Sequence, residues 1–134
     1  METFTLENDI HVQGVTAKHF PDGIIAAFEK IHTLLPPDGK RRYFGLSRPE
    51  NGQIVYHAVA EIFHGENCSG TDVRLLIPKG KYTGKMLRDF AKDTRLFRST
   101  FDEILARPGL DPQGWCVEVY PNEKDAQCMV RLAG

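Results

Sequence analysis

The amino-acid sequence predicts an α+β fold in which two tandem duplicated β-α-β-β units form an antiparallel-rich sheet with two helices on one face. The halves of the chain show the same order of strand-like and helix-like segments, and a Phe-x-x-Ile spacing recurs in both predicted helices. With 134 residues the chain suits one domain, 1–134, whose halves are approximately 10–63 and 72–133. One unit alone would be marginal, so the two are expected to share a core and to leave a ligand groove between them.

The first half opens with a strand and a helix. Residues 1–9 are polar and are expected to be a loose lead-in, whereas residues 10–17 alternate in the manner of a strand. Asp22 is a suitable N-cap for the next helix, and Pro36 and Pro37 end it because proline cannot continue the hydrogen-bond ladder. The apolar face of this helix comprises Ile24, Phe28, Ile31 and Leu35.

Hairpins end both halves. In the first, strands at 42–48 and 54–63 flank Asn51-Gly52, a pair that readily adopts the positive φ of a tight turn. In the second, strands at 115–120 and 126–133 flank a polar turn.

The second half begins after a loop at 64–71 that contains two glycines. Residues 72–90 are expected to hold the extended segments of this unit. A helix is predicted over 94–107, before Pro108-Gly109, and its apolar face comprises Phe97, Phe101, Ile104 and Leu105.

The composition argues against several classes of function. The 17 Lys and Arg residues against 18 Asp and Glu residues give a net charge of −1, unlike a general nucleic-acid binder. The three cysteines form no C-x-x-C pair, so neither a disulfide framework nor a zinc site is expected, and the cytoplasm is the expected location. No apolar run approaches the roughly 18 residues of a membrane-spanning helix. No metal or other cofactor is expected.

Two apparent motifs are not expected to carry a function. Residues 80–85 resemble a phosphate loop, but the run is one residue short and Met86 replaces the hydroxyl that would bind magnesium. His57 lies in the middle of a predicted strand, where a histidine is more often a satisfied sheet residue than a catalytic base.

Glu118 is the most informative residue of the sequence. Strand alternation places Trp115, Val117 and Val119 on one face, and Cys116, Glu118 and Tyr120 on the other. The apolar face is expected to pack under the helices. Glu118 then either faces water or forms the floor of an aromatic groove, where a buried carboxylate would call for a cationic partner.

Three segments together resemble the GyrI-like family, which also forms the effector-binding half of bacterial multidrug-responsive regulators. They are Tyr56-His57-Ala58-Val59, then Ile77-Pro78-Lys79-Gly80-Lys81-Tyr82, then Trp115-Cys116-Val117-Glu118-Val119-Tyr120. Their order and spacing follow the family's tyrosine-bearing strand, its I-P-x-G-x-Y run and its late E-x-Y strand, and the match spans roughly residues 10–132.

The resemblance implies two units related by a pseudo-two-fold axis, with a small molecule bound between them. It also implies that Glu118 is the carboxylate of the pocket, with Tyr120 and Trp115 at or beside it, although the alternation places Trp115 on the opposite face. In the internal repeat Tyr43 corresponds to Cys116 and would face the same groove. The strand of Tyr56 has apolar residues on both faces, so the sequence does not show which face Tyr56 occupies. The candidate ligand-binding residues are therefore Glu118, Tyr120, Cys116, Tyr43, Tyr56 and Trp115.

The expected function is the binding of a cationic or amphipathic aromatic molecule, for ligand sensing or sequestration in a bacterial stress or drug response. Two alternatives stay open. One is hydrolysis of strained cyclopropane-type electrophiles, with Glu118 as general base and Tyr120 as proton donor. The other is modulation of a protein partner such as DNA gyrase or a regulator. The nine lead-in residues cannot supply a helix-turn-helix, so direct nucleic-acid binding is not expected.

Overall fold

The computed structural model describes residues 1–134 and contains eight strands, two α-helices and one short 3-10 helix. The strands are β1 (Glu2–Leu6), β2 (Ile10–Thr16), β3 (Tyr43–Glu50), β4 (Gln53–Glu61), β5 (Val73–Ile77), β6 (Gly80–Leu87), β7 (Cys116–Val119) and β8 (Ala126–Arg131). The helices are α1 (Ile24–Leu34), η1 (Phe90–Lys92) and α2 (Arg95–Leu105). One sheet holds all the strands, in the order β1-β6-β8-β7-β3-β4-β2-β5, and every neighbouring pair is antiparallel.

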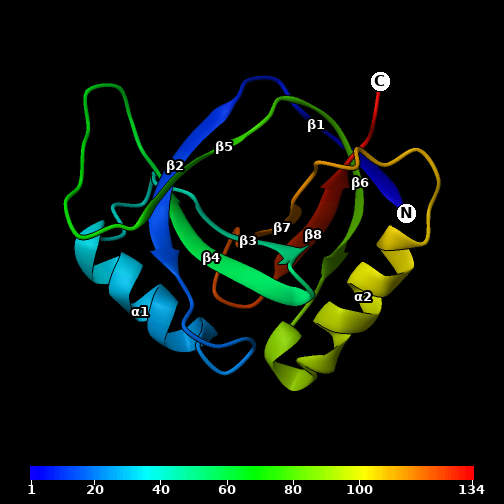
Figure 1. The fold of residues 1–134 in the computed structure, drawn as a ribbon, viewed down its shortest axis with the longest axis horizontal. Helices are drawn as coiled ribbons and strands as arrows, with labels where there is room; N and C mark the ends of the chain where they lie inside the picture. The colour runs from blue at the N-terminus through cyan, green and yellow to red at the C-terminus, as the bar shows by residue number, and fades with distance from the viewer.

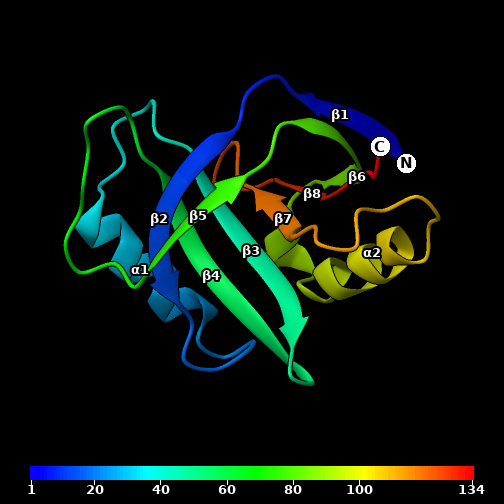
Figure 2. The ribbon, with the colours of Figure 1, turned by 45° about the horizontal axis from the view of Figure 1, so that its top comes forward.

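The sheet curls into a half-barrel, and both helices lie outside it (Figures 1 and 2). Its concave face forms a core from strand residues and Trp115, among which Phe44, Leu46 and Val117 are at most 1% exposed. Burying one such side chain stabilises the fold by about 1.5–3 kcal/mol. Two glycines permit the tight curl, since a Cβ on Gly14 would lie 2.1 Å from Ala58 O, and one on Gly84 would lie 1.9 Å from a carbonyl of β8.

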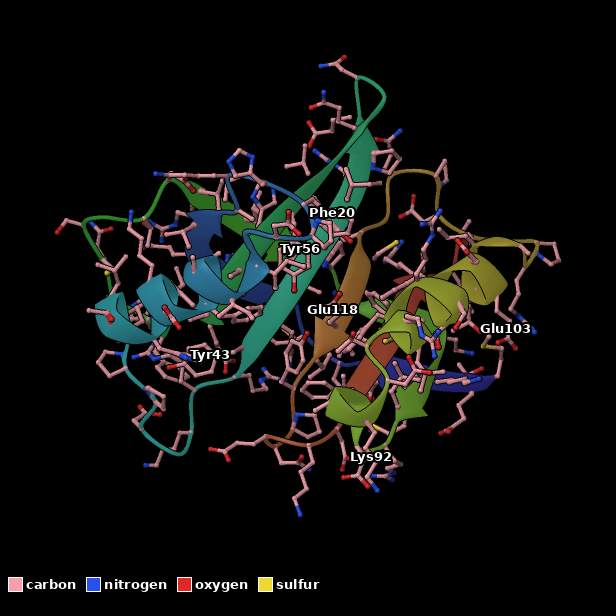
Figure 3. The ribbon with its side chains drawn as sticks, turned by 90° about the horizontal axis from the view of Figure 1, so that it is seen from below. Phe20, Tyr43, Tyr56, Lys92, Glu103 and Glu118 are labelled. Atoms are coloured by element: carbon pink, nitrogen blue, oxygen red, sulfur yellow. The ribbon has the colours of Figure 1, made fainter.

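Each helix covers one end of the convex face. Ile31 of α1 is fully buried against β2 and β4, and Ile104 of α2 is fully buried against β6 and β8. Between the helices, β3 and β7 run side by side at the centre of the sheet (Figure 3). This arrangement leaves a strip of the convex face between α1 and α2, with β3 and β7 as its floor.

Several sequence predictions are confirmed. The fold is α+β, the sheet is antiparallel, and both helices lie on one face. The hairpin between β3 and β4 turns at Asn51 (φ 53°) and Gly52 (φ 79°), as the Asn-Gly pair indicates. Neither helix has the length and hydrophobicity that a membrane span requires.

Other predictions are wrong in detail. The lead-in 1–9 is not loose, because β1 pairs with β6 through five residues, an edge pairing that its short polar sequence did not indicate. Asp22 does not cap α1, since Gly23 takes the N-cap position and makes no side-chain hydrogen bond. Leu105 is 52% exposed although the helical pattern placed it on the buried face.

The face prediction for β7 is also wrong. Val117 and Trp115 do not pack under the helices; they lie in the concave core, and Glu118 faces the helices instead. The reason is the curl of the sheet, which lets the concave apolar face bury itself without help. The helices are then left to cover the opposite face.

Candidate functional site

Glu118 lies on the floor of the strip between α1 and α2. It is the third residue of β7, and it pairs with Gly45 of β3 on one side and with Cys128 of β8 on the other. Figure 3 shows Glu118 between the two helices, with Tyr56 and then Phe20 beyond it. The residue is only 8% exposed, so the carboxylate does not simply face water.

Two phenol groups donate hydrogen bonds to one oxygen of this carboxylate. The Tyr56 hydroxyl donates to Glu118 Oε1 at 2.6 Å, and the Tyr120 hydroxyl donates to the same oxygen at 2.5 Å. No hydrogen bond reaches Oε2, and no Lys or Arg forms an ion pair with Glu118. The protein therefore supplies neutral donors to half of the carboxyl group and no positive charge.

Burial controls the protonation of all three groups. Loss of solvent raises the pKa of the Glu118 carboxyl, and the phenol hydrogen bonds only partly oppose this effect. Burial and the nearby carboxylate raise the pKa of Tyr56 and of Tyr120 well above the ordinary value for tyrosine. Both phenols thus stay protonated and act as donors, whereas Glu118 is an acceptor or a proton-binding group.

Gly45 makes room for this cluster. A Cβ at this position would lie 2.0 Å from the Tyr56 hydroxyl oxygen and 2.5 Å from Glu118 Oε1. Real side chains do not approach so closely, so the missing side chain lets Tyr56 extend from β4 across β3 to reach β7.

Aromatic rings surround the two tyrosines. Phe28 of α1 contacts both, with ring centroids 6.3 Å from Tyr56 and 5.5 Å from Tyr120. Phe90 lies 5.8 Å from Tyr120, and Phe20 stacks on Tyr56 at 6.0 Å with an angle of 29° between the ring planes. These rings make the surroundings of Glu118 aromatic, and they cover it from the sides of both helices.

The other sequence candidates divide between the two faces of the sheet. Cys116 lies on the same face as Glu118 and is partly buried beside α2; burial raises the pKa of its thiol to about 11, so it is protonated at neutral pH. Trp115 lies on the concave face, where the Arg48 guanidinium stacks over its ring at 4.0 Å, and it does not reach the cluster.

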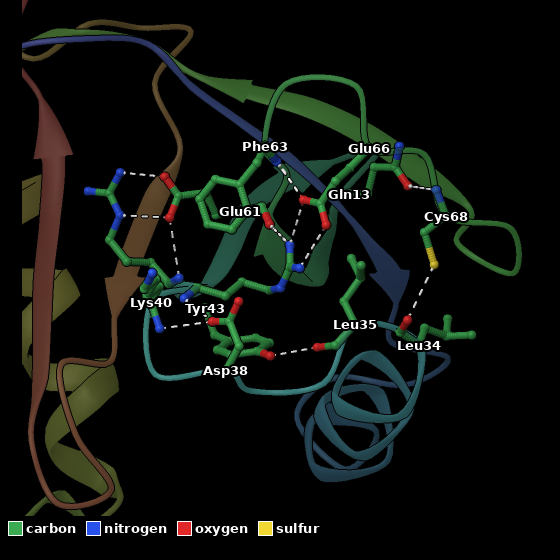
Figure 4. Close-up of polar contacts among 12 residues, drawn as sticks. Gln13, Leu34, Leu35, Asp38, Lys40, Tyr43, Glu61, Phe63, Glu66 and Cys68 are labelled. Carbon is green, nitrogen blue, oxygen red and sulfur yellow. Dashed lines mark hydrogen bonds and ion pairs between the residues drawn. The ribbon is translucent and has the colours of Figure 1, made fainter.

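Tyr43 is on the predicted face but has a structural role. Its hydroxyl donates to the Leu35 carbonyl at 2.5 Å, at the end of α1 (Figure 4). Beside it, the buried Arg41 binds Glu66 through two hydrogen bonds of 3.0 and 2.9 Å and holds the loop after β4 against the start of β3. Tyr43 is thus part of the packing of α1 and is not joined to Glu118.

Gly45, Phe20, Phe28 and Phe90 were not among the predicted site residues, although Phe28 was expected on the apolar face of its helix. Gly45 carried a usable signal, because a glycine inside an otherwise apolar strand often marks a close approach by another group. Phe20 and Phe90 lie outside the long helices and strands, so no periodicity pointed to them. The structure also places no three His, Cys, Asp or Glu side chains together in a group that could hold a metal ion. His57 Nδ1 instead lies 2.9 Å from the Thr16 hydroxyl.

Comparison with known proteins adds information on the fold. No protein-family model matches the chain, and no curated protein matches its sequence. A similar solved structure is the integron cassette protein VCH_CASS2 from the mobile metagenome of Vibrio cholerae. It has a TM-score of 0.70 at 14% sequence identity, and the match covers 98% of this chain and 94% of the other. At this identity the likeness shows a shared fold and carries no activity with it.

Proposed function

We propose that this chain is a GyrI-like small-molecule-binding domain whose ligand is a cationic or amphipathic aromatic molecule held at Glu118. The observation that carries the proposal is the carboxylate of Glu118, a residue that is only 8% exposed and has no basic partner in the protein. A buried charge without a counter-ion is costly. A ligand cation would remove this cost, whereas a neutral ligand would not.

The surroundings suit an aromatic cation in two further ways. Both tyrosines donate to Oε1, so Oε2 keeps its acceptor capacity for an N–H or alkylammonium group of the ligand. The rings of Phe28 and Phe90 lie next to the tyrosines, where their faces can stack on the ligand and attract its charge.

The proposed domain type includes an internal duplication. The elements β2-α1-β3-β4 and β6-α2-β7-β8 follow the same order, and the sheet order is symmetric about the β3–β7 pair. Gly14 and Gly84 each take the fifth position of the first strand of their unit, and each approaches a carbonyl of the last. The duplication would be supported if residues 10–63 superposed on residues 74–133 with helices and hairpins aligned.

Hydrolysis of a strained electrophile is a second candidate, favoured by one observation. A carboxyl with a raised pKa is a stronger base when ionised than an ordinary glutamate, and two protonated phenols lie beside it as proton donors. Glu118→Ala would then abolish turnover of a cyclopropane-containing substrate, with product formation followed by mass spectrometry. Turnover that survives this change would exclude Glu118 as the base.

The binding proposal is tested by a charge-matched pair of ligands. Calorimetry at pH 8 would compare an N-methyl styrylpyridinium dye with the neutral styrylpyridine, for the wild-type protein and Glu118→Gln. A charge-assisted contact is worth about 1.5–3 kcal/mol, so the variant should lose about tenfold or more in affinity for the cation and little for the neutral compound. Glu103→Gln, an exposed change on α2, is the matched control. Equal losses for the two compounds would refute the charge-pairing role.

A further inference from the structure

A hollow of about 430 Å³ lies beside the candidate site. Its lining residues come from the loop after β2 and from the tip of the β3–β4 hairpin: Ala17, Lys18, His19, Phe20, Gln53 and Ile54. The volume is within the range of about 300–1,000 Å³ that is usual for small-molecule pockets. Phe20 and Ile54 are 47% and 43% exposed and supply apolar surface to a lining whose larger share is polar.

Phe20 connects this hollow to Glu118. One side of its ring stacks on Tyr56, and the same residue lines the hollow. Tyr56 in turn donates its hydroxyl hydrogen bond to Glu118. In Figure 3 the three labelled residues lie one after another, with Tyr56 between Phe20 and the buried carboxylate, so Phe20 lies between the hollow that it lines and the Tyr56–Glu118 pair.

We infer that Phe20 is a gate, and that the hollow holds the apolar tail of a ligand whose cationic head reaches Glu118. The inference rests on the proposed function and adds the shape of the ligand: one positive charge with an extended apolar tail. An exposed aromatic side chain changes rotamer rapidly, so a rotation of Phe20 uncovers Tyr56 and opens the hollow towards Glu118 without unfolding of the loop. The tail then contacts Ile54 in place of water.

The charge of the hollow sets a second requirement. Lys18 is its one formally charged lining residue, and it makes no ion pair. A second positive charge at the end of the tail would therefore lie near a free ammonium group. Monocations with apolar tails fit the site better than dications of the same length.

The test uses styrylpyridinium dyes with N-ethyl, N-hexyl and N-(trimethylammonio)hexyl groups, whose fluorescence reports binding. A buried methylene is worth about fourfold in affinity, so in a partly open hollow N-hexyl should exceed N-ethyl by about tenfold or more. The dication should bind more weakly than the N-hexyl monocation. Ile54→Ser should remove most of the chain-length effect, and Phe20→Ala should accelerate association of the N-ethyl dye in rapid-mixing experiments.

The control is Leu105→Ala, which removes an exposed apolar side chain from the end of α2 and should change neither result. An unchanged association rate in Phe20→Ala, or a full chain-length effect in Ile54→Ser, would overturn the gate and the tail site. Selectivity for the cation that depends on Glu118 would in that case leave the proposed function standing. If the wild-type protein shows no preference for cationic over neutral dyes, both proposals fail.

Discussion

The uncompensated charge of Glu118 should make the unliganded protein less stable at neutral pH than its Glu118→Gln variant. The folded state raises the pKa of this carboxyl because it is buried, and thus it binds the proton more tightly than the unfolded chain does. The resulting stabilisation is full below pH 4.5, the ordinary value, and is lost as the pH rises through the folded-state pKa. Glutamine keeps an acceptor oxygen for both phenols and carries no charge at any pH, so the variant should not show this loss.

The magnitude follows from the linkage between pKa and free energy. Each unit by which folding raises the pKa removes about 1.4 kcal/mol of stability once the carboxyl is ionised. For 134 residues the unfolding entropy is about 0.28 kcal/mol/K, so each such unit corresponds to a melting temperature lower by about 5 °C. The variant should therefore equal the wild type near pH 4 and exceed it at pH 8.

Calorimetric melting of both proteins between pH 4 and pH 8 measures this difference. Subtracting the wild-type melting temperatures from those of the variant at each pH removes the contributions of other carboxylates. Among these are Glu61 and Glu66, whose pKa values are lowered by arginine partners, so that they stabilise the fold at high pH and not at low pH. Glu103→Gln, on the exposed face of α2, should give a flat difference curve. A Glu118→Gln variant that melts below the wild type at pH 8 would show that the charge is already compensated. The physical basis for a cationic ligand would then be lost.

Two further predictions concern the supports of the site. Gly45→Ala places a Cβ against the Tyr56 hydroxyl, so we expect Tyr56 to leave Glu118, with a loss of cation selectivity and a cost of about 1–3 kcal/mol in stability by denaturant unfolding. Gly114→Ala is the control, because its φ is not positive and the nearest atom to the new Cβ, Asp111 O, lies 3.1 Å away; an unaffected Gly45→Ala would refute the packing argument. Arg41→Gln removes the guanidinium donors that hold the pKa of Glu66 near 2, so the pKa of Glu66 measured by NMR should return towards 4.5. If Glu66 still titrates near 2 in this variant, the hydrogen bond from the Phe63 backbone N–H is the main cause of the low pKa.

The sequence predicts the part of this fold that local patterns encode. The apolar faces of α1 and α2, with the exception of Leu105, the Asn51-Gly52 turn and the alternation around Glu118 each depend on residues close together in the chain, and the structure confirms them. The pairing of β1 with β6 joins residues about 80 positions apart, and no local pattern encodes it. The curl of the sheet is of the same kind, because Gly14 and Gly84 permit it through close approaches to residues more than 40 positions away, Ala58 and Cys128.

The candidate site shows the same division. Tyr120 follows Glu118 by two residues, so one strand places both on one face and the sequence sufficed. Tyr56 is 62 residues from Glu118, and its side chain reaches Glu118 only because Gly45 has no side chain. That contact exists only once β4, β3 and β7 are paired in the folded sheet. Phe20 is harder still, since its position depends on an irregular loop.

The position of the cluster in the sheet explains why this strip, and not the concave face, is available for function. The concave face is filled by its own apolar side chains, of which Leu46, Val59 and Met129 have no exposure, so a carboxylate there would have neither donors nor access. On the convex face α1 covers β2 and β4 and α2 covers β6 and β8, and the central β3–β7 pair is covered only by side chains. Those side chains are aromatic rings that can rotate without breaking backbone hydrogen bonds. A buried charge can be tolerated in such a place, because the rings that shield it can also move to admit a partner for it.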